Sequence, residues 1–231
     1  MKMFMLNKHP VIQLSDRRYV VDTGSPISFH YCSLDSLVIN GLSFRMNSPV
    51  CSQADLEALT GSHIDGLIGL DILCQTGLTI DLENMILDLD FDNTKYGYQD
   101  EAGFYSISFD FFMGSYLITN DIFLGQRLKN VILDTGAPIP YISSRFASLL
   151  EKSNEAYLDY SPEFGTLQGE YLYGNLVFEH GEQVHRRAVK VGLMPQAIDM
   201  FGFFDAILGI SDLTDKHLAF DFENKVVYFK P

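Results

Sequence analysis

The chain is poor in the residues that build disulfide frameworks and metal sites. Its 231 residues include six histidines and only three cysteines, Cys32, Cys51 and Cys74. An odd, widely spaced set of cysteines excludes a disulfide framework, and no Cys-x-x-Cys pair is present to hold zinc. The histidines stand singly, without a His-x-x-x-His spacing. We therefore expect no metal and no cofactor, and we expect three reduced thiols packed in the core.

Long hydrophobic runs and positive charge are also scarce. No apolar stretch reaches the roughly 18 residues that cross a bilayer. The apolar run at the N-terminus is too short for a secretory signal, which predicts a cytoplasmic protein. Lys and Arg number 16 against 30 Asp and Glu, a net charge of −14. Because nucleic-acid affinity depends on neutralising phosphates with Lys and Arg, neither nucleic acid nor a membrane is an expected partner.

What the chain does contain is an internal repeat. Residues 18–26 read RYVVDTGSP and residues 130–138 read NVILDTGAP, at an offset of 112. Residues 64–73 read IDGLIGLDIL and residues 204–213 read FDAILGISDL, at an offset of 140. Each copy therefore has an apolar run, an Asp-Thr-Gly motif and, farther on, an apolar-apolar-Gly motif. The pattern indicates two diverged copies of one unit, the second longer between its motifs.

Short apolar runs flanked by turn residues predict an all-β fold with a few short helices. Residues 20–21 and 131–133, before the two Asp-Thr-Gly motifs, have the pattern of buried strands. Two segments have the pattern of hairpins closed by Glu-Asn turns, residues 79–88 and 219–229. Two segments have the pattern of helices, residues 52–59 and 144–152.

The residue types of the two Asp-Thr-Gly motifs suit a pair of facing carboxylates, Asp22 and Asp134. The glycine of each motif permits a tight turn and lets a backbone N–H approach the carboxylate. The threonine hydroxyl of each can bond the backbone of the opposite loop. Two carboxyl groups about 3 Å apart share one proton, since both cannot ionise cheaply. The predicted supporting residues are Thr23, Gly24, Ser25, Thr135, Gly136 and Ala137.

These paired motifs resemble those of the aspartic peptidases, the superfamily of pepsin and retropepsin. The resemblance implies a bilobed all-β fold with pseudo-twofold symmetry, with one lobe over residues 1–95 and the other over residues 96–231, divided in a polar stretch. It implies a single-chain endopeptidase that binds a peptide or protein substrate as an extended strand. Asp22 and Asp134 would activate a water between them. The alternative is a catalytically silent or single-substrate peptide-binding module on the same fold. We expect a monomer.

The resemblance also implies residues that contact the substrate. Pepsin-like enzymes carry a flap hairpin in the first lobe, but here the longer second copy places the best candidate hairpin at residues 166–178. Tyr171 or Tyr173 would then be the flap tyrosine, and the other interpretation is an ordinary sheet hairpin with surface tyrosines. Residues 201–204, which are mostly Phe, either pack in the core or line the cleft. The residues after the two loops that would contact the substrate are Ile27, Phe29, Ile139 and Tyr141.

One difference between the copies bears on the charge of the pair. Ser25 follows the first motif, whereas Ala137 follows the second. Since a hydroxyl can donate to a nearby ionised carboxylate, we predict that Asp22 is the more acidic member, although the pair titrates as a unit. The resemblance further predicts a bell-shaped rate profile with an optimum on the acid side.

Four further aspartates are not expected to be catalytic. Asp65 and Asp205 precede the apolar-apolar-Gly motifs, where we expect them to support turns. Asp81 and Asp221 lie beside the hairpin turns, where we expect solvated side chains.

Overall fold

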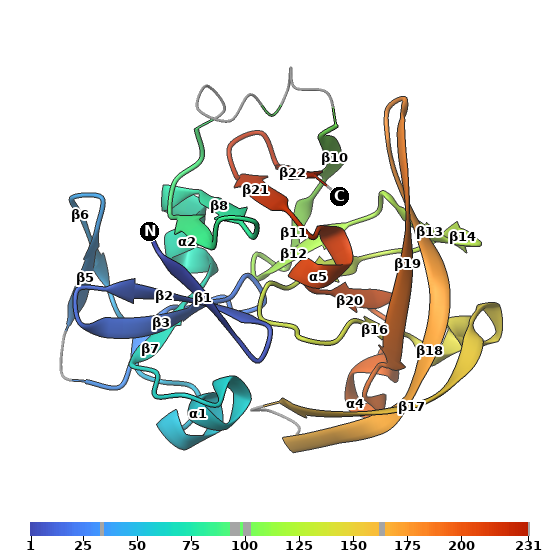
Figure 1. Ribbon diagram of the computed structural model, residues 1–231, viewed down its shortest axis with the longest axis horizontal. Helices are drawn as coiled ribbons and strands as arrows, with labels where there is room; N and C mark the ends of the chain where they lie inside the picture. Colours follow the sequence, from blue (N-terminus) through green and yellow to red (C-terminus); the bar gives the residue numbers. More distant parts are fainter. Residues whose placement is uncertain (33–34, 93–97, 99–102, 162–164, 231) are drawn as a thin grey trace.

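The computed structural model describes residues 1–32, 35–92, 98, 103–161 and 165–230, and strands dominate it (Figure 1). The predicted all-β class with a few short helices is confirmed. The predicted boundary between lobes, at residue 95, lies outside the described residues. The bilobed arrangement and its pseudo-twofold symmetry stay predictions.

One five-stranded sheet is built from the N-terminal part of the chain. Its order is β1 (Met3–Leu6), β2 (His9–Leu14), β3 (Arg17–Val21), β7 (Gly66–Ile68) and β4 (Phe29–His30). The first three strands form an antiparallel meander, whereas β3 runs parallel to β7 with Val20 opposite Leu67. Every residue of β7 is buried, as expected of a strand covered on both faces.

A second, ten-stranded sheet is built from the later part of the chain. Its order is β11 (Asp110–Phe112), β12 (Tyr116–Thr119), β15 (Val131–Leu133), β20 (Ala206–Leu208), β16 (Tyr141–Ile142), β19 (Gln183–Leu193), β18 (Gly165–His180), β13 (Ile122–Leu124) and β14 (Gln126–Arg127), with β17 (Glu151–Ser161) paired to β18. β15 runs parallel to β20 with Leu133 opposite Leu208, the same arrangement as β3 and β7. The long strands β17, β18 and β19 lie on the right of Figure 1.

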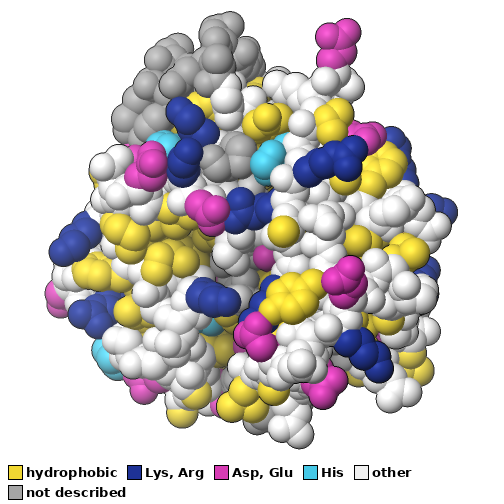
Figure 2. Space-filling model, turned by 45° about the vertical axis from the view of Figure 1, so that its right-hand side comes forward, with side chains coloured by type: hydrophobic (Ala, Val, Ile, Leu, Met, Phe, Trp, Pro, Cys, Tyr) yellow, Lys and Arg dark blue, Asp and Glu magenta, His cyan; other side chains and the backbone are white. Residues whose placement is uncertain are grey.

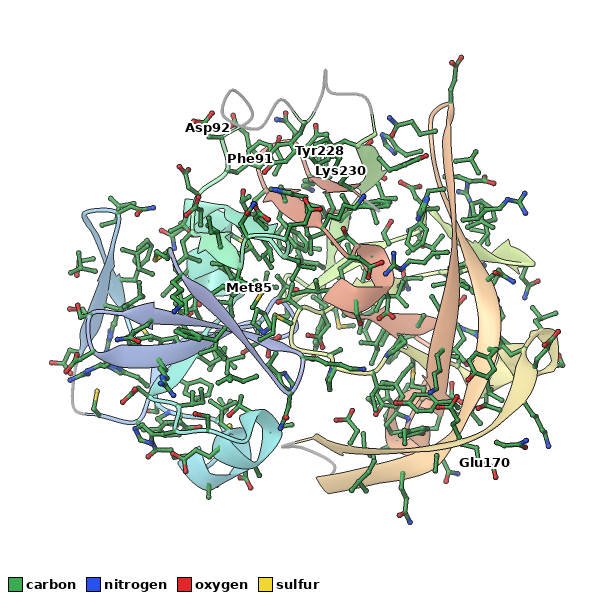
Figure 3. All side chains as sticks on the ribbon, in the orientation of Figure 1. Met85, Phe91, Asp92, Glu170, Tyr228 and Lys230 are labelled. Carbon is green, nitrogen blue, oxygen red and sulfur yellow. The ribbon has the colours of Figure 1, made fainter. Side chains whose placement is uncertain are left out.

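A third sheet joins the two parts of the chain. Its order is β10 (Tyr105–Ser108), β22 (Val226–Lys230), β21 (His217–Asp221), β8 (Leu78–Asp81) and β9 (Ile86–Asp88). β8–β9 and β21–β22 are the two predicted hairpins, and β8 pairs with β21 with Thr79 opposite Ala219. Phe91, just after β9, stacks on Tyr228 of β22 with ring centroids 6.0 Å apart (both labelled in Figure 3). A separate hairpin consists of β5 (Ser36–Ile39) and β6 (Leu42–Arg45).

The helices are short. They are α1 (Gln53–Thr60), α2 (Leu70–Thr76), α4 (Gln196–Asp199), α5 (Ile210–Leu213) and a 3-10 helix over Ser144–Leu149. α1 confirms the predicted helix at residues 52–59, and Ser52 caps it in a reciprocal pair of bonds with Asp55. The predicted helix at residues 144–152 is wrong beyond Leu149, because the chain enters β17 at Glu151 and pairs with β18. None of the helices in the described ranges is long and apolar enough to span a membrane.

The core draws side chains from all three sheets. Ile12, Leu208 and Phe220 are at most 1% exposed and belong to one cluster. Burying a side chain of this size contributes roughly 1.5–3 kcal/mol. On the face drawn in Figure 2, hydrophobic side chains lie between charged side chains of both signs.

The cysteines lie outside this core. All three are free, but Cys32 and Cys74 are exposed and Cys51 is partly buried. The predicted core location is therefore wrong. Cys74 lies on the outward side of α2, whose buried residues are Leu70, Ile72 and Leu73.

Candidate functional site

The two parallel strand pairs hold Asp22 and Asp134 in place. The N–H of Asp22, directly after β3, donates to the carbonyl oxygen of Ile68 on β7 at 3.0 Å. The N–H of Asp134, directly after β15, donates to the carbonyl oxygen of Leu208 on β20 at 2.9 Å. The apolar-apolar-Gly motif of each copy thus anchors the aspartate of the same copy.

The two carboxyl groups lie against each other's loops. The N–H of Gly24 donates to Oδ1 of Asp22 at 2.7 Å, and the N–H of Gly136 donates to Oδ1 of Asp134 at 2.8 Å. A Cβ added at Gly24 would lie 2.4 Å from Cγ of Asp134, and one at Gly136 would lie 2.6 Å from Cγ of Asp22. Neither position has room for a side chain. The structure therefore brings the two predicted carboxyl groups together.

The two threonines tie the loops to each other. Thr23 Oγ1 donates to the carbonyl oxygen of Leu133 at 2.8 Å and accepts the N–H of Thr135 at 2.9 Å. Thr135 Oγ1 donates to the carbonyl oxygen of Val21 at 3.0 Å and accepts the N–H of Thr23 at 3.0 Å. Both threonines are buried. The predicted bonds from each hydroxyl to the opposite loop are present.

The surroundings of Asp134 favour its protonated form. Burial raises the pKa of Asp134 well above its usual range, and the negative charge of Asp22 and a hydrogen bond with that carboxyl group raise it further. The backbone N–H groups of Gly136 and Ala137 act in the opposite direction but do not outweigh burial. This is the arrangement in which two carboxyl groups share one proton.

Ser25 does not play the role predicted for it. Its hydroxyl donates to the carbonyl oxygen of Ile27 at 2.9 Å rather than to a carboxylate. The predicted source of the charge difference between the two aspartates is therefore wrong. Burial is instead the largest cause of the raised pKa of Asp134. The carbonyl oxygen of Ala137 lies close against Gly209 of the second apolar-apolar-Gly motif. A Cβ at Gly209 would clash with this oxygen.

The carboxyl pair faces a pocket of about 710 Å³. Its walls are mostly apolar and come from both parts of the chain. They comprise His9, Val20, Asp22, Gly24, Ser25, Pro26, Ile27, Phe29, Val50, Cys51, Leu56, Leu59, Leu67, Tyr116, Ile132, Asp134, Gly136, Ala137, Pro138, Tyr141, Asp159, Leu167, Pro195, Ala197, Ile198, Phe201, Phe203, Phe204 and Ile207. Three of the predicted substrate-contacting residues, Ile27, Phe29 and Tyr141, are among them. Ile139 is not among them, and it packs in a small cluster with Tyr157 and Met194.

The predicted hairpin at residues 166–178 is wrong. This stretch lies inside one continuous strand, β18, because it pairs with β17 on one side and β19 on the other. The hairpin beside the pocket is β17–β18, in which Asp159 lies opposite Leu167. Both of these residues line the pocket.

Neither tyrosine proposed for the flap is among the pocket-lining residues. Tyr171 lies farther along β18 and packs on Tyr157, with ring centroids 5.1 Å apart. Tyr173 donates from its hydroxyl to Glu155 at 2.5 Å and is 38% exposed. The continuity of β18 explains the difference, since it places both residues in the middle of a strand instead of near a turn.

The pocket also contains residues that sequence reasoning missed. His9, on β2, is 4% exposed, and its burial lowers its pKa although the charges of Asp22 and Asp159 oppose this. No local pattern marks His9 or Asp159. The segment 201–204, which is mostly Phe, was the one sequence feature that pointed to the pocket wall. Phe201 and Phe203, at 63% and 48% exposed, line the pocket and are not core residues.

The four other aspartates have structural roles. Asp65 accepts the backbone N–H of Arg18 at 2.9 Å, and Asp205 accepts that of Lys129 at 2.7 Å. These bonds join segments distant in sequence, so the role differs from the predicted support of a local turn. Asp81 and Asp221 are 8% and 3% exposed, so the prediction of solvated side chains is wrong. Each accepts two bonds from the asparagine of its own hairpin turn, which offset the loss of hydration on burial. Within the described ranges, no group of three or more His, Cys, Asp or Glu could hold a metal ion.

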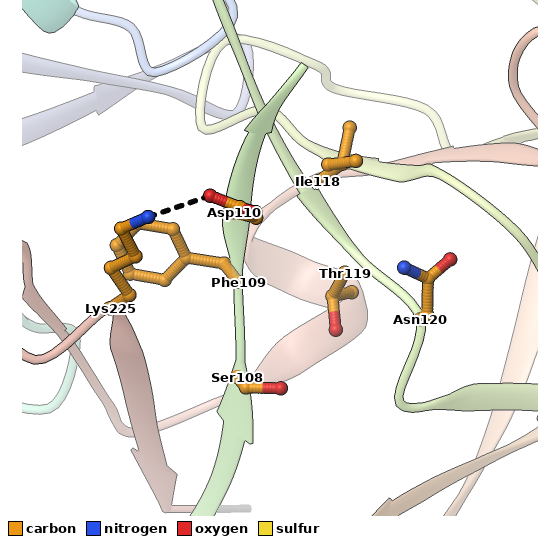
Figure 4. Close-up of a pocket in the computed structure, with 7 residues that line it drawn as sticks. All are labelled: Ser108, Phe109, Asp110, Ile118, Thr119, Asn120 and Lys225. Atoms are coloured by element: carbon orange, nitrogen blue, oxygen red, sulfur yellow. Dashed lines mark hydrogen bonds and ion pairs between the residues drawn. The ribbon is translucent and has the colours of Figure 1, made fainter.

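A second, smaller cavity of about 290 Å³ shares no residue with this pocket (Figure 4). It contains the ion pair of Lys225 with Asp110, at 2.8 Å. Its lining consists of Ser108, Phe109, Asp110, Ile118, Thr119, Asn120 and Lys225. It holds one carboxylate, already paired with an ammonium group, and offers no counterpart to the pair of Asp22 and Asp134.

A comparison with models of known protein families finds no match, and a comparison with curated proteins finds none either. The geometry of the carboxyl pair and its pocket is therefore the ground for a functional proposal.

Proposed function

We propose that the chain is an aspartic endopeptidase. The observation that carries the proposal is the pair of carboxyl groups, Asp22 and Asp134, each lying against the glycine of the opposite loop at the wall of one pocket. The raised pKa of Asp134 supports it, because one member of the pair must keep a proton. The resemblance of both motifs to the aspartic peptidases points to the same chemistry.

In the proposed reaction a water lies between the two carboxyl groups. Asp22 accepts a proton from the water, whose oxygen attacks the peptide carbonyl carbon, while Asp134 gives its proton to the carbonyl oxygen. A tetrahedral diol results. The proton held by Asp22 then passes to the amide nitrogen, the C–N bond breaks, and one diol hydroxyl returns its proton to Asp134. The pair ends with the single proton it began with.

The walls of the pocket suit an extended peptide. Leu56 and Leu59 of α1 line it from the first part of the chain, and Asp159 and Leu167 of the β17–β18 hairpin line it from the second. α1 and β17 contact each other, so these two elements meet beside the pocket. Apolar walls on both sides of a carboxyl pair favour a peptide segment with apolar side chains.

The test is cleavage of a diverse peptide mixture from pH 3 to 7, read by mass spectrometry. The unmodified chain should cut at defined sites, with more cutting on the acid side of this range. Asp134→Asn removes the proton donor and should abolish every cut, a loss of at least about a thousandfold in rate.

Asp16→Asn is the matched control, since it makes the same change from carboxyl to amide at a side chain that is 91% exposed and lies outside the pocket. It should cut as the unmodified chain does. Cuts that persist in Asp134→Asn would exclude the proposed pair. A well-folded unmodified chain that makes no cuts would instead favour the catalytically silent or single-substrate peptide-binding module.

A further inference from the structure

A third carboxyl group lines the pocket that holds the pair. Asp159, on β17, shares the pocket wall with Asp22 and Asp134 but lies on a different element from either. The proposed hydrolysis uses only two carboxyl groups. Asp159 is therefore a charged wall residue that the reaction itself does not require.

The position of Asp159 is fixed by its neighbours. The hydroxyl of Tyr141 donates to Oδ2 of Asp159 at 2.6 Å. Tyr141 is 5% exposed and packs edge-on against Tyr157, two residues before Asp159 on the same strand, with ring centroids 6.0 Å apart. A tyrosine hydroxyl donates a hydrogen bond but brings no positive charge. The Tyr141 hydroxyl thus holds Asp159 in the pocket wall without contributing a positive charge.

The charge of the pocket is of one sign. Three carboxyl groups line it, and no Lys or Arg does among the described residues. His9 is the one lining residue that can become a cation, and burial lowers its pKa, so it is neutral at neutral pH. The net charge of −14 for the whole chain adds long-range attraction for cationic peptides.

The same pocket offers apolar surface for the stem of a long basic side chain. Phe201 and Phe203 are largely exposed, and their rings are stacked with centroids 5.9 Å apart. Lys and Arg bury their methylene chains along such surface while the charged head reaches a polar group. Aromatic faces also attract the charged head itself.

We propose that Asp159 is a specificity-determining residue that binds a lysine or arginine side chain of the peptide substrate. This proposal rests on the proposed function for the cleavage that follows binding, but the recognition of a basic side chain is separable from it. The preference comes from charge-assisted hydrogen bonds between the basic head group and the Asp159 carboxylate.

The test uses two sets of acetylated, fluorescently labelled octapeptides of Ala, Val and Phe. One set carries a single Lys at successive positions, and the matched set carries Gln at the same positions. Binding to the Asp134→Asn chain is measured by fluorescence anisotropy at neutral pH. At one position the Lys peptide should bind about tenfold more tightly than the Gln peptide. Adding Asp159→Asn should bring this ratio close to one.

Glu170→Gln in the same Asp134→Asn background is the matched control. Glu170 is an exposed residue of β18, opposite Ala156 on the same hairpin, and does not line the pocket (labelled in Figure 3). Glu170→Gln removes one negative charge, as Asp159→Asn does, and should keep the full Lys preference. A melting curve by circular dichroism establishes that each variant is folded.

Three outcomes would overturn the proposal. They are the absence of any position at which Lys improves binding, a Lys preference that survives Asp159→Asn, and a loss of affinity in Asp159→Asn that is equal for Lys and Gln peptides. The last would mean that Asp159 only positions Tyr141. The unmodified chain is incubated with the same peptides in parallel, and a Lys preference in binding without any cleavage would contradict the proposed function alone.

Discussion

At the residue scale, the carboxyl group of Asp134 lowers the free energy of unfolding when it must ionise in its buried place. Its pKa is raised chiefly by burial, so the folded chain binds more protons than the unfolded chain between the usual pKa of an aspartate and the raised one. Stability therefore falls as the pH rises through that interval. The cost is absent well below the usual pKa of an aspartate, and it grows as the pH rises toward the raised pKa.

We predict that Asp134→Asn stabilises the fold at neutral pH while it abolishes cleavage. The amide has nearly the shape of the carboxyl group but cannot ionise, so the free energy of unfolding at pH 7 should rise by about 1–3 kcal/mol. Thermal unfolding followed by circular dichroism should show a melting temperature several degrees higher at pH 7 and a much smaller difference near pH 3. Equal gains at both pH values would contradict a pKa origin.

At the element scale, the loops after β3 and β15 are bound to each other as well as to their own sheets. Each threonine hydroxyl donates to the strand that leads into the other loop and accepts the N–H of the other threonine. The two loops are therefore placed as one unit. This placement brings the carboxyl groups together, because each lies against the opposite glycine.

We predict that Thr23→Val disrupts this unit whereas Thr23→Ser preserves it. Valine has nearly the shape of threonine but leaves the carbonyl oxygen of Leu133 and the N–H of Thr135 without a partner in a buried place, at about 1–3 kcal/mol each. Urea unfolding should show a loss of about 2–5 kcal/mol for Thr23→Val and about 1 kcal/mol or less for Thr23→Ser. Equal losses in the two variants would mean that packing, not the hydroxyl, is what matters.

At the scale of the whole molecule, the third sheet prevents the two parts of the chain from being independent. β8 and β9 belong to the first predicted lobe, whereas β10, β21 and β22 belong to the second, and all five share one sheet. Leu78, Ile80, Leu218 and Phe220, which lie along the seam of β8 and β21, are each 0% exposed. Separating the two parts would expose these side chains, at roughly 1.5–3 kcal/mol for each.

We predict that the chain unfolds in one cooperative transition. Far-ultraviolet circular dichroism reports the strands, and the fluorescence of the 12 tyrosines, in a chain without tryptophan, reports the packing. The two signals should give the same urea midpoint. Two separate transitions, or midpoints that differ between the signals, would show that the lobes unfold independently.

Local patterns in the sequence were enough for the strands before the two Asp-Thr-Gly motifs, the two Glu-Asn hairpins and the paired motifs. Asp22 and Asp134 follow buried strands as predicted, and both Glu-Asn hairpins lie where the alternation of residues places them. Glycine and threonine in the motifs also have the contacts that their chemistry suggested. These features depend on residues that are neighbours along the chain, or on a motif that occurs twice, and so they can be read without a structure.

Tertiary packing alone decided the rest. The stretch at residues 166–178, predicted as a hairpin, is one strand because it has a partner on both sides, and no local pattern reveals partners distant in sequence. His9 and Asp159 belong to no motif and reach the pocket only because β2 and β17 pass beside it. The burial that raises the pKa of Asp134 is likewise a property of the assembled fold. The sequence by itself therefore determined which residues form the carboxyl pair, and only the tertiary structure decided what surrounds it, since the walls of a pocket depend on contacts between distant segments.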